Sequence, residues 1–194
     1  YEALKHILVE YAEEKPVLTM EDSLAGRKII RGGDNVIKKF LIEKGNLDEG
    51  FSKSDRIVEG EYRVPHQEQA YLENHGIAAW VEKDGTIVTR GSLQCPYYVR
   101  KALVQIFGLP PDKIRVINAC TGGAFGGKED YPSLIAGHAA LLALKTGKPV
   151  KLIYDRQEDM AATTKRHPAV VKHRTGVRKD GKLLAQDITI TMDG

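Results

Sequence analysis

The sequence has few of the residues that would indicate a disulfide framework or a metal cluster. It contains only two cysteines, Cys95 and Cys120, in different segments and without the spacing of metal ligands. Because an iron–sulfur cluster normally takes four thiolates, this chain cannot supply such a cluster alone. A disulfide is disfavoured in a reducing compartment, so we expect two free thiols packed in the interior.

Long apolar runs and a strong charge imbalance are also missing. No apolar run approaches the length of a membrane span, and the N-terminus lacks the basic and apolar segments of an export signal. The formal net charge is +3, so we expect neither a nucleic-acid nor a membrane partner. With 42% apolar and 28% charged residues in 194, the composition predicts a cytoplasmic chain with one substantial core, or one domain and part of another.

The first part of the chain, up to about Ser54, has a weak and mixed pattern. Apolar residues recur at helical spacing before Pro16, which predicts an N-terminal helix; they are Leu4, Ile7, Leu8 and Tyr11. Residues 19–26 resemble a capping turn, and a glycine-broken connector and an irregular or short helical segment follow. We place a domain boundary near Ser54.

The second part has the signals of a mixed sheet with helices. Residues 57–64 alternate as a strand, and Asp-Gly turns at 83–85 and 179–181 separate alternating apolar segments, which predicts two β-hairpins. Helices are predicted at 96–107 and 131–146, each followed by glycine, and two further short strands at 113–119 and 150–155. This pattern predicts an α+β architecture with mixed sheets and packed helices rather than a doubly wound fold.

A glycine-rich loop, TGGAFGGKED at residues 121–130, lies between a predicted strand and a predicted helix. Glycines let a backbone approach a ligand closely, whereas Phe125 is of a type that is usually buried. Gly122 to Lys128 satisfies the first seven positions of a nucleotide P-loop, but Glu129 replaces the Ser or Thr that would bind magnesium. A P-loop is therefore disfavoured, and a turn without a ligand remains an alternative.

Gln94, in GSLQCPYYVRKAL, stands between a strand end and the first turn of a helix. A lone glutamine is usually a surface residue. At this position its amide could project into the same crevice as the glycine loop.

Several motifs in one order resemble the molybdenum-cofactor-binding subunit of the xanthine dehydrogenase and aldehyde oxidase family. They are SLQCPYYVRKAL, FGLPPDKIRV and GGAFGGKED, with DRQEDMAATTKRHP after them and EGEYR and HQEQAYLENHGIAAW before them. The resemblance implies that residues 55–194 are the N-terminal portion of a molybdopterin-binding domain. Residues 1–54 resemble the tail of an α/β hammerhead domain, with extra material near residues 4–14. The resemblance also implies that the rest of the subunit follows these residues. That part would either have been truncated or form a separate chain.

The resemblance implies a molybdopterin that the protein positions without a side-chain ligand to the metal. Gln94 would hydrogen-bond an oxygen ligand of molybdenum, and the backbone of Phe125 and Gly126 would lie against the metal centre and the pterin. The implied cofactor contacts are Gln94, Gly123, Ala124, Phe125, Gly126 and Gly127. The nucleotide form of the pterin, with the cytosine dinucleotide among the alternatives, stays open.

Glu129 matches the position that binds the heterocycle in purine-oxidising members of the family. Alternatively, its charge complements the N-terminus of the following helix. The implied reaction is hydroxylation, with water, of an electron-poor carbon in a purine, another N-heterocycle or an aldehyde. The general-base glutamate of the family lies beyond residue 194, so no catalytic residue is assigned. The implied partners are the rest of the large subunit, a [2Fe–2S] subunit and an FAD subunit; a non-catalytic assembly domain is the alternative.

Other polar residues in these motifs are expected to be structural. The segment HQEQAYLEN, with Glu68 and Glu73, predicts a hydrogen-bonded turn. Arg156, Glu158 and Asp159 resemble a segment of the family for which the resemblance implies an internal ion pair. His138, in an apolar helix, predicts a hydrogen-bonded histidine of the core.

Overall fold

The computed structural model describes residues 2–194 and divides into two compact units. One unit combines the chain up to Pro65 with Pro168–Gly194, and the other is His66–His167. The chain therefore leaves the first unit and returns to it. The start of a cofactor-binding domain near Ser54 stays a prediction. The division into compact units does not test it, because a compact unit and a family domain need not begin at the same residue.

The first unit contains a three-stranded antiparallel sheet in the order β1-β6-β7. Its strands are β1 (Arg56–Val64), β6 (Ala169–Val177) and β7 (Leu183–Met192). The predicted hairpin joins β6 to β7, with Gly181 at φ +85° in the turn. The short helix α2 (Leu47–Ser52) packs on the sheet so closely that a Cβ on Gly50 would lie 2.8 Å from the Cβ of Ala185.

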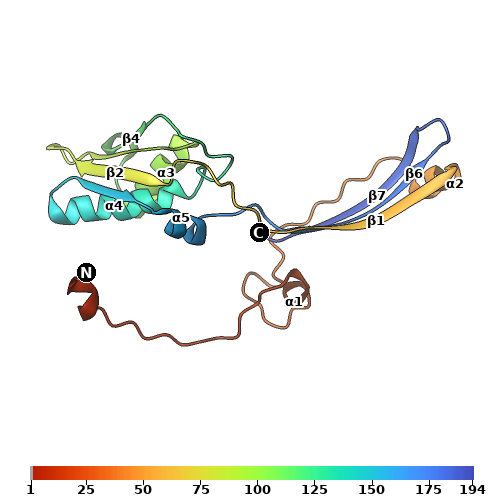
Figure 1. Ribbon diagram of the computed structural model, residues 1–194, viewed down its shortest axis with the longest axis horizontal. Helices are drawn as coiled ribbons and strands as arrows, with labels where there is room; N and C mark the ends of the chain where they lie inside the picture. The colour runs from red at the N-terminus through yellow and green to blue at the C-terminus, as the bar shows by residue number, and fades with distance from the viewer. Residues whose placement is uncertain (1) are drawn as a thin grey trace. The chain divides into compact units, whose positions relative to one another are not determined.

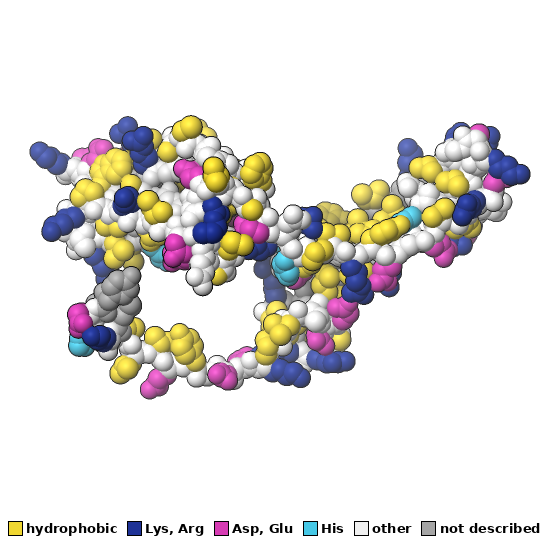
Figure 2. Space-filling view, in the orientation of Figure 1, with side chains coloured by type: hydrophobic (Ala, Val, Ile, Leu, Met, Phe, Trp, Pro, Cys, Tyr) yellow, Lys and Arg dark blue, Asp and Glu magenta, His cyan; other side chains and the backbone are white. Residues whose placement is uncertain are grey.

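Strand alternation gives this sheet two different faces. The register places Tyr62, Val171 and Ile190 side by side on one face, where Tyr62 also stacks on His173 with ring centroids 5.4 Å apart. Yellow side chains gather along these strands in Figure 2. The neighbouring positions in the sequence, among them Glu61 and Lys172, place charged side chains on the opposite face.

The N-terminal helix predicted from Leu4 to Tyr11 is wrong. The structure has a 3-10 helix at Glu2–His6, and residues 7–18 form neither helix nor strand. Leu8 and Tyr11 are exposed, so no packed face stabilises a helix that would be marginal by itself. The predicted capping turn is the short helix α1 (Met20–Leu24), whose first turn donates from the Asp22 N–H to the Thr19 hydroxyl.

The second unit contains a mixed four-stranded sheet in the order β4-β3-β2-β5. The predicted hairpin is present as β2 (Gly76–Val81) and β3 (Ile87–Gly91), and β5 (Val150–Ile153) adds antiparallel to β2. Strand β4 (Ile114–Asn118) is parallel to β3, since helix α3 (Pro96–Phe107) and a 3-10 turn at Pro111–Lys113 carry the chain back across the sheet.

The core of this unit lies between the sheet and helices α3 and α4 (Pro132–Thr146), which contact each other as well as the strands. Figure 1 shows α4 running below β2. Both helices end at a left-handed glycine, as predicted. Helix α5 (Arg156–Ala162) follows β5 and begins with the Asp155 side chain accepting the Glu158 N–H. The core consists of Ile77, Ala79, Ile87, Leu93, Val99, Leu103, Ile114, Ile135, Ala136, Ala139, Ala140 and Ala143.

Two predictions about burial are wrong. His138 is exposed, because helix α4 packs its alanines and Ile135 inward and turns His138 to the other side. The helix is apolar nearly all round, so its sequence does not reveal which face is buried. The two cysteines are free, as expected, but Cys120 is exposed and Cys95 half-buried, since both lie in the connections that flank β4 and α3.

Replacing Leu103 by Ala should lower the free energy of unfolding by about 2–5 kcal/mol, because a buried cavity would remain. Leu103 is 0% exposed. The control is Leu134→Ala on α4, where the side chain is 55% exposed and the expected change is within about 0.5 kcal/mol. Urea unfolding of both variants tests this packing, and equal losses would contradict it.

Candidate functional site

The backbone of the glycine loop is unusual because three of its residues have a positive φ. Gly123, Phe125 and Gly126 have φ values of +98°, +53° and +92°. A non-glycine residue at positive φ costs free energy and persists only where its surroundings hold it. Phe125 is 77% exposed, so the expectation from its residue type is wrong. Its smaller neighbours Ala124 and Gly127 face inward instead.

Gln94 lies directly against this loop. Its side-chain carbonyl oxygen accepts hydrogen bonds from the backbone N–H groups of Gly126 and Lys128, both at 3.0 Å. The backbone N–H of Gln94 also donates to the carbonyl of Lys128 at 2.8 Å. The structure therefore brings together Gln94 and the loop, two features that the sequence placed in one crevice.

The ring of Tyr71 forms the floor of the loop. A Cβ on Gly127 would lie 2.6 Å from the Cε1 atom of Tyr71, and a Cβ on Gly123 would lie 3.2 Å from the Cβ of Tyr71. These distances leave no room for a side chain at residue 127. The loop thus rests on an aromatic ring that is itself fully buried.

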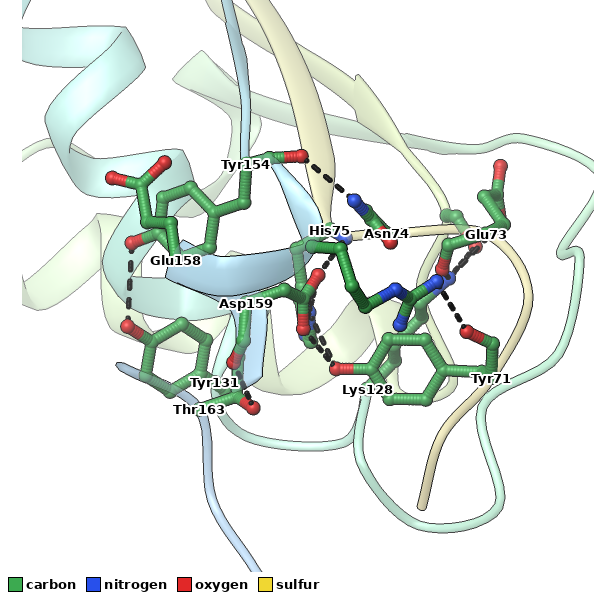
Figure 3. Close-up of polar contacts among 12 residues, drawn as sticks. Tyr71, Glu73, Asn74, His75, Lys128, Tyr131, Tyr154, Glu158, Asp159 and Thr163 are labelled. Atoms are coloured by element: carbon green, nitrogen blue, oxygen red, sulfur yellow. Dashed lines mark hydrogen bonds and ion pairs between the residues drawn. The ribbon is translucent and has the colours of Figure 1, made fainter. Parts of the chain in front are cut away.

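Lys128 points into the protein and away from the loop surface. Its side chain is 0% exposed, and its Nζ donates to the Glu73 carbonyl (2.7 Å), the Glu73 Oε2 atom (3.0 Å) and the Ser92 hydroxyl (3.2 Å). Figure 3 shows Lys128 between Glu73 and Tyr71, and Nζ lies 4.7 Å from the Tyr71 ring centroid. The lysine of the P-loop-like pattern therefore has a structural position and does not face a ligand.

Glu73 connects this lysine to the start of the loop. Its Oε2 atom also accepts the Gly122 N–H at 2.7 Å. Burial alone would raise the pKa of Glu73, but hydrogen bonds from Ser92, Gly122 and Lys128 hold it below its usual value. Glu73 is thus a stable anion, in agreement with the structural role expected for this motif.

A buried network continues behind Tyr71. The Tyr71 hydroxyl donates to Asp159 Oδ1 at 2.5 Å, and the backbone N–H of His75 donates to Asp159 Oδ2 at 2.5 Å (Figure 3). The Nδ1 atom of His75 lies 3.1 Å from Asp159 Oδ1. Burial raises the pKa of Asp159, but the hydrogen bonds from Tyr71 and His75 outweigh it, so the pKa is lowered. Burial lowers the pKa of His75 despite the nearby carboxylate.

This network was not predicted from the sequence, which suggested other partners for Asp159. Among the described residues, no ion pair joins Arg156 to Glu158 or Asp159. Arg156 instead donates to the backbone carbonyls of Tyr71 and Leu72, both at 2.8 Å. The expected internal ion pair is therefore wrong for Arg156 and Glu158, because helix α5 turns only Asp159 into the protein. The sequence did contain a signal for this network, because Tyr71, His75 and Asp159 all lie in the motifs that resemble the family.

Glu68 has the structural role that the sequence predicted. It pairs with Lys165 at 2.7 Å and accepts the N–H of Ala70 at 3.3 Å. Ala70 has φ +51°, which identifies a tight turn before Tyr71. This turn directs Tyr71 beneath the glycine loop.

Glu129 lies at the exposed end of the loop. Helix α4 begins at Pro132, and its N-cap, Tyr131, has no side-chain cap hydrogen bond. Within residues 2–194, Glu129 forms no hydrogen bond or ion pair. Its carboxylate therefore caps no backbone N–H of α4 directly.

These features define a class of protein: an α+β domain with a hydrogen-bonded glycine loop at its surface, in which Phe125 is exposed and has a positive φ. A family model described as a molybdopterin cofactor-binding domain matches residues 31–194. The chain belongs to this molybdopterin cofactor-binding domain family, as the sequence motifs indicated.

Curated relatives have similar sequences. The chain is 36% identical over 192 residues to a probable xanthine dehydrogenase subunit of Bacillus subtilis, covering 98% of this chain and 26% of the relative. It is 34% identical over 193 residues to the nicotinate dehydrogenase large molybdopterin subunit of Eubacterium barkeri, covering 99% and 45%. The chain thus spans less than half the length of these two relatives.

Solved structures have the same fold. The chain resembles a reconstituted CO dehydrogenase of Oligotropha carboxidovorans with a TM-score of 0.66 and 28% identity, over 74% of this chain and 18% of that one. It also resembles an aldehyde oxidoreductase of Desulfovibrio gigas with a TM-score of 0.84 over 99% and 21% of the two chains. At 24% identity, the second likeness shows the fold alone.

Two kinds of feature are absent from the described residues. No helix in residues 2–194 is long and apolar enough to cross a membrane. The same residues contain no group of three or more His, Cys, Asp or Glu side chains that could hold a metal ion.

The free energy of unfolding should decrease as the pH falls from about 7 to 5, because unfolded His75 binds a proton near its ordinary pKa of about 6.5 while the buried ring resists it. His75 faces Asp159, Tyr71, Tyr131, Tyr154 and Lys128. Asp159, with its lowered pKa, contributes stability above about pH 4 that is lost only at more acidic pH.

Denaturant unfolding at several pH values measures this slope. His75→Asn should flatten it, whereas His138→Asn, on the exposed side of α4, should leave it unchanged. Equal slopes in wild type and His75→Asn would show that the buried ring does not control the pH dependence.

Proposed function

We propose that this chain is part of a molybdenum-cofactor-dependent hydroxylase similar to xanthine dehydrogenase. Its cofactor contacts would be Gln94 and the loop residues Gly123, Ala124, Phe125, Gly126 and Gly127. The observation that carries the proposal is the orientation of the Gln94 amide. Its oxygen accepts hydrogen bonds from two loop N–H groups. Its Nε2 has no hydrogen-bond partner among the described residues, and Gln94 is exposed.

The residues present fit a pterin that carries molybdenum. Gly126 has φ +92°, and a Cβ there would meet no atom within 4 Å, so the surface over the loop is open. A neutral donor such as the Gln94 amide suits a metal centre whose ligands come from the cofactor itself. When bound, the molybdopterin would supply the two-electron redox chemistry, and the chain would position it.

Gln94 would contribute a neutral hydrogen-bond donor. A glutamine amide can accept from the loop with its oxygen and donate to the cofactor with its nitrogen at the same time. A carboxylate would keep the first function and lose the second. Phe125 would contact the metal centre as an apolar neighbour, since its side chain extends from the clamped loop.

Glu129 would bind the substrate. Its carboxylate is exposed and has no partner in residues 2–194, which favours an acceptor for a ring N–H over a helix cap. The proposed substrates are purines or other N-heterocycles, with aldehydes as a second class. The names of the two curated relatives, a xanthine dehydrogenase subunit and a nicotinate dehydrogenase subunit, support a heterocycle.

The complete enzyme would require further polypeptide. Both relatives are named as subunits, one of them as a large molybdopterin subunit, which supports partner subunits. We assign the general-base glutamate to the rest of the large subunit, and [2Fe–2S] and FAD to partner subunits. Residues 1–54 would be the end of a hammerhead domain, and residues 55–194 the start of the cofactor-binding domain. Mass spectrometry of the released pterin would identify its nucleotide form.

The complete protein, purified from its source, should contain molybdenum and pterin and should oxidise a heterocycle or an aldehyde. Gln94→Glu should keep both loop hydrogen bonds and the metal but lose about 10²–10³ in rate, since one polarising donor is removed. Gln105→Glu on α3 is the control, because this side chain is exposed and forms no side-chain hydrogen bond within the described residues. A protein without molybdenum would favour a non-catalytic assembly domain, and an unchanged rate would reject the role of Gln94.

Glu129→Gln should reduce kcat/KM for a purine by at least about tenfold, because a charged hydrogen bond contributes about 1.5–3 kcal/mol. Aromatic aldehydes have no ring N–H and should be oxidised as before. The melting temperature should not change, because Glu129 has no partner to lose. Equal losses for both substrate classes, or a loss of stability, would support the helix-dipole alternative.

A further inference from the structure

We propose that Glu73 and Lys128 are positioning residues, whose ion pair, with its ammonium buried and its carboxylate 42% exposed, holds the glycine loop in the conformation that receives the cofactor. Neither residue would touch the cofactor. The inference rests on the proposed function for the identity of the ligand, and on the geometry of the loop for everything else.

One carboxylate oxygen fixes the loop at both ends. Glu73 Oε2 accepts the N–H of Gly122 at 2.7 Å, where the loop begins, and the ammonium of Lys128 at 3.0 Å, where it ends. The intervening residues must therefore bridge a fixed span. They do so with three positive φ values at Gly123, Phe125 and Gly126.

Lys128 has no donor left for a ligand. An ammonium has three N–H donors, and the three acceptors around it are the Glu73 carbonyl, Glu73 Oε2 and the Ser92 hydroxyl. Its side chain is 0% exposed. A buried charge is tolerated only when it is paired and hydrogen-bonded, so this cation is committed to the protein interior.

The middle of the loop depends on these two anchors. Gln94 accepts the N–H groups of Gly126 and Lys128, so a shift of the Lys128 backbone would move both hydrogen bonds. Phe125 keeps its φ of +53° only because the residues on either side are held. Without the ion pair, Phe125 would relax to a negative φ and the Gly126 N–H would turn away from Gln94.

The central experiment is Lys128→Met in the complete protein, since Met keeps an unbranched stem and loses the charge. Hydrogen exchange of peptides covering residues 121–128 should become at least about tenfold faster, because local opening no longer breaks the contacts of a buried ammonium. Exchange in helices α3 and α4 should stay the same. Molybdenum and pterin content should fall with the loss of loop protection.

Lys113→Met is the matched control. The ammonium of Lys113 also binds the carbonyl oxygen (2.9 Å) and the carboxylate (3.1 Å) of a single residue, Asp84, but in the β2–β3 turn. This variant should leave both the exchange of residues 121–128 and the cofactor content at wild-type values.

Glu73→Gln covers the case in which Lys128→Met does not fold. It keeps an oxygen for the Gly122 N–H and removes the charge that pairs with Lys128, so it should accelerate exchange in the same peptide. If a variant folds and the exchange of residues 121–128 does not change, the ion pair does not hold the loop. If exchange becomes faster but the cofactor content stays complete, the ion pair does not position the cofactor. Wild-type protein without molybdenum would instead contradict the proposed function.

Discussion

The buried ammonium of Lys128 is the constraint on which the loop depends. Removing this cation from water is costly, and the cost is offset by the carboxylate and carbonyl of Glu73, the hydroxyl of Ser92 and the face of the Tyr71 ring. These partners come from the segment before β2 and from the residue that follows β3. The same requirement draws the backbone of residues 122–128 over Tyr71 and leaves only Phe125 to project outward.

The Tyr71 hydroxyl extends this constraint to the far end of the second unit. Its hydrogen bond to Asp159 joins residues 88 positions apart, and His75 adds both its backbone N–H and its ring to the same carboxylate. Helix α5 is therefore linked to the floor of the glycine loop.

Much of the fold could be predicted from local sequence. Both Asp-Gly hairpins and both long helices with their terminal glycines are present, because turn geometry and helix ends depend on a few adjacent residues. The burial of individual side chains was predicted less well. His138 and Phe125 were expected to be buried from their surroundings in the sequence, and both are exposed, since burial depends on which face a neighbouring element covers.

The sequence by itself determined the family, the mixed α+β class and the pairing of Gln94 with a glycine loop, because these depend on ordered motifs and on short-range periodicity. Only the tertiary structure decided where the charges go. Lys128 could have faced a phosphate, as its pattern suggests, and Asp159 could have paired with Arg156. Their partners, Glu73 and Tyr71, are remote in sequence, and the cost of burying an unpaired charge is set by contacts that form only in the folded chain.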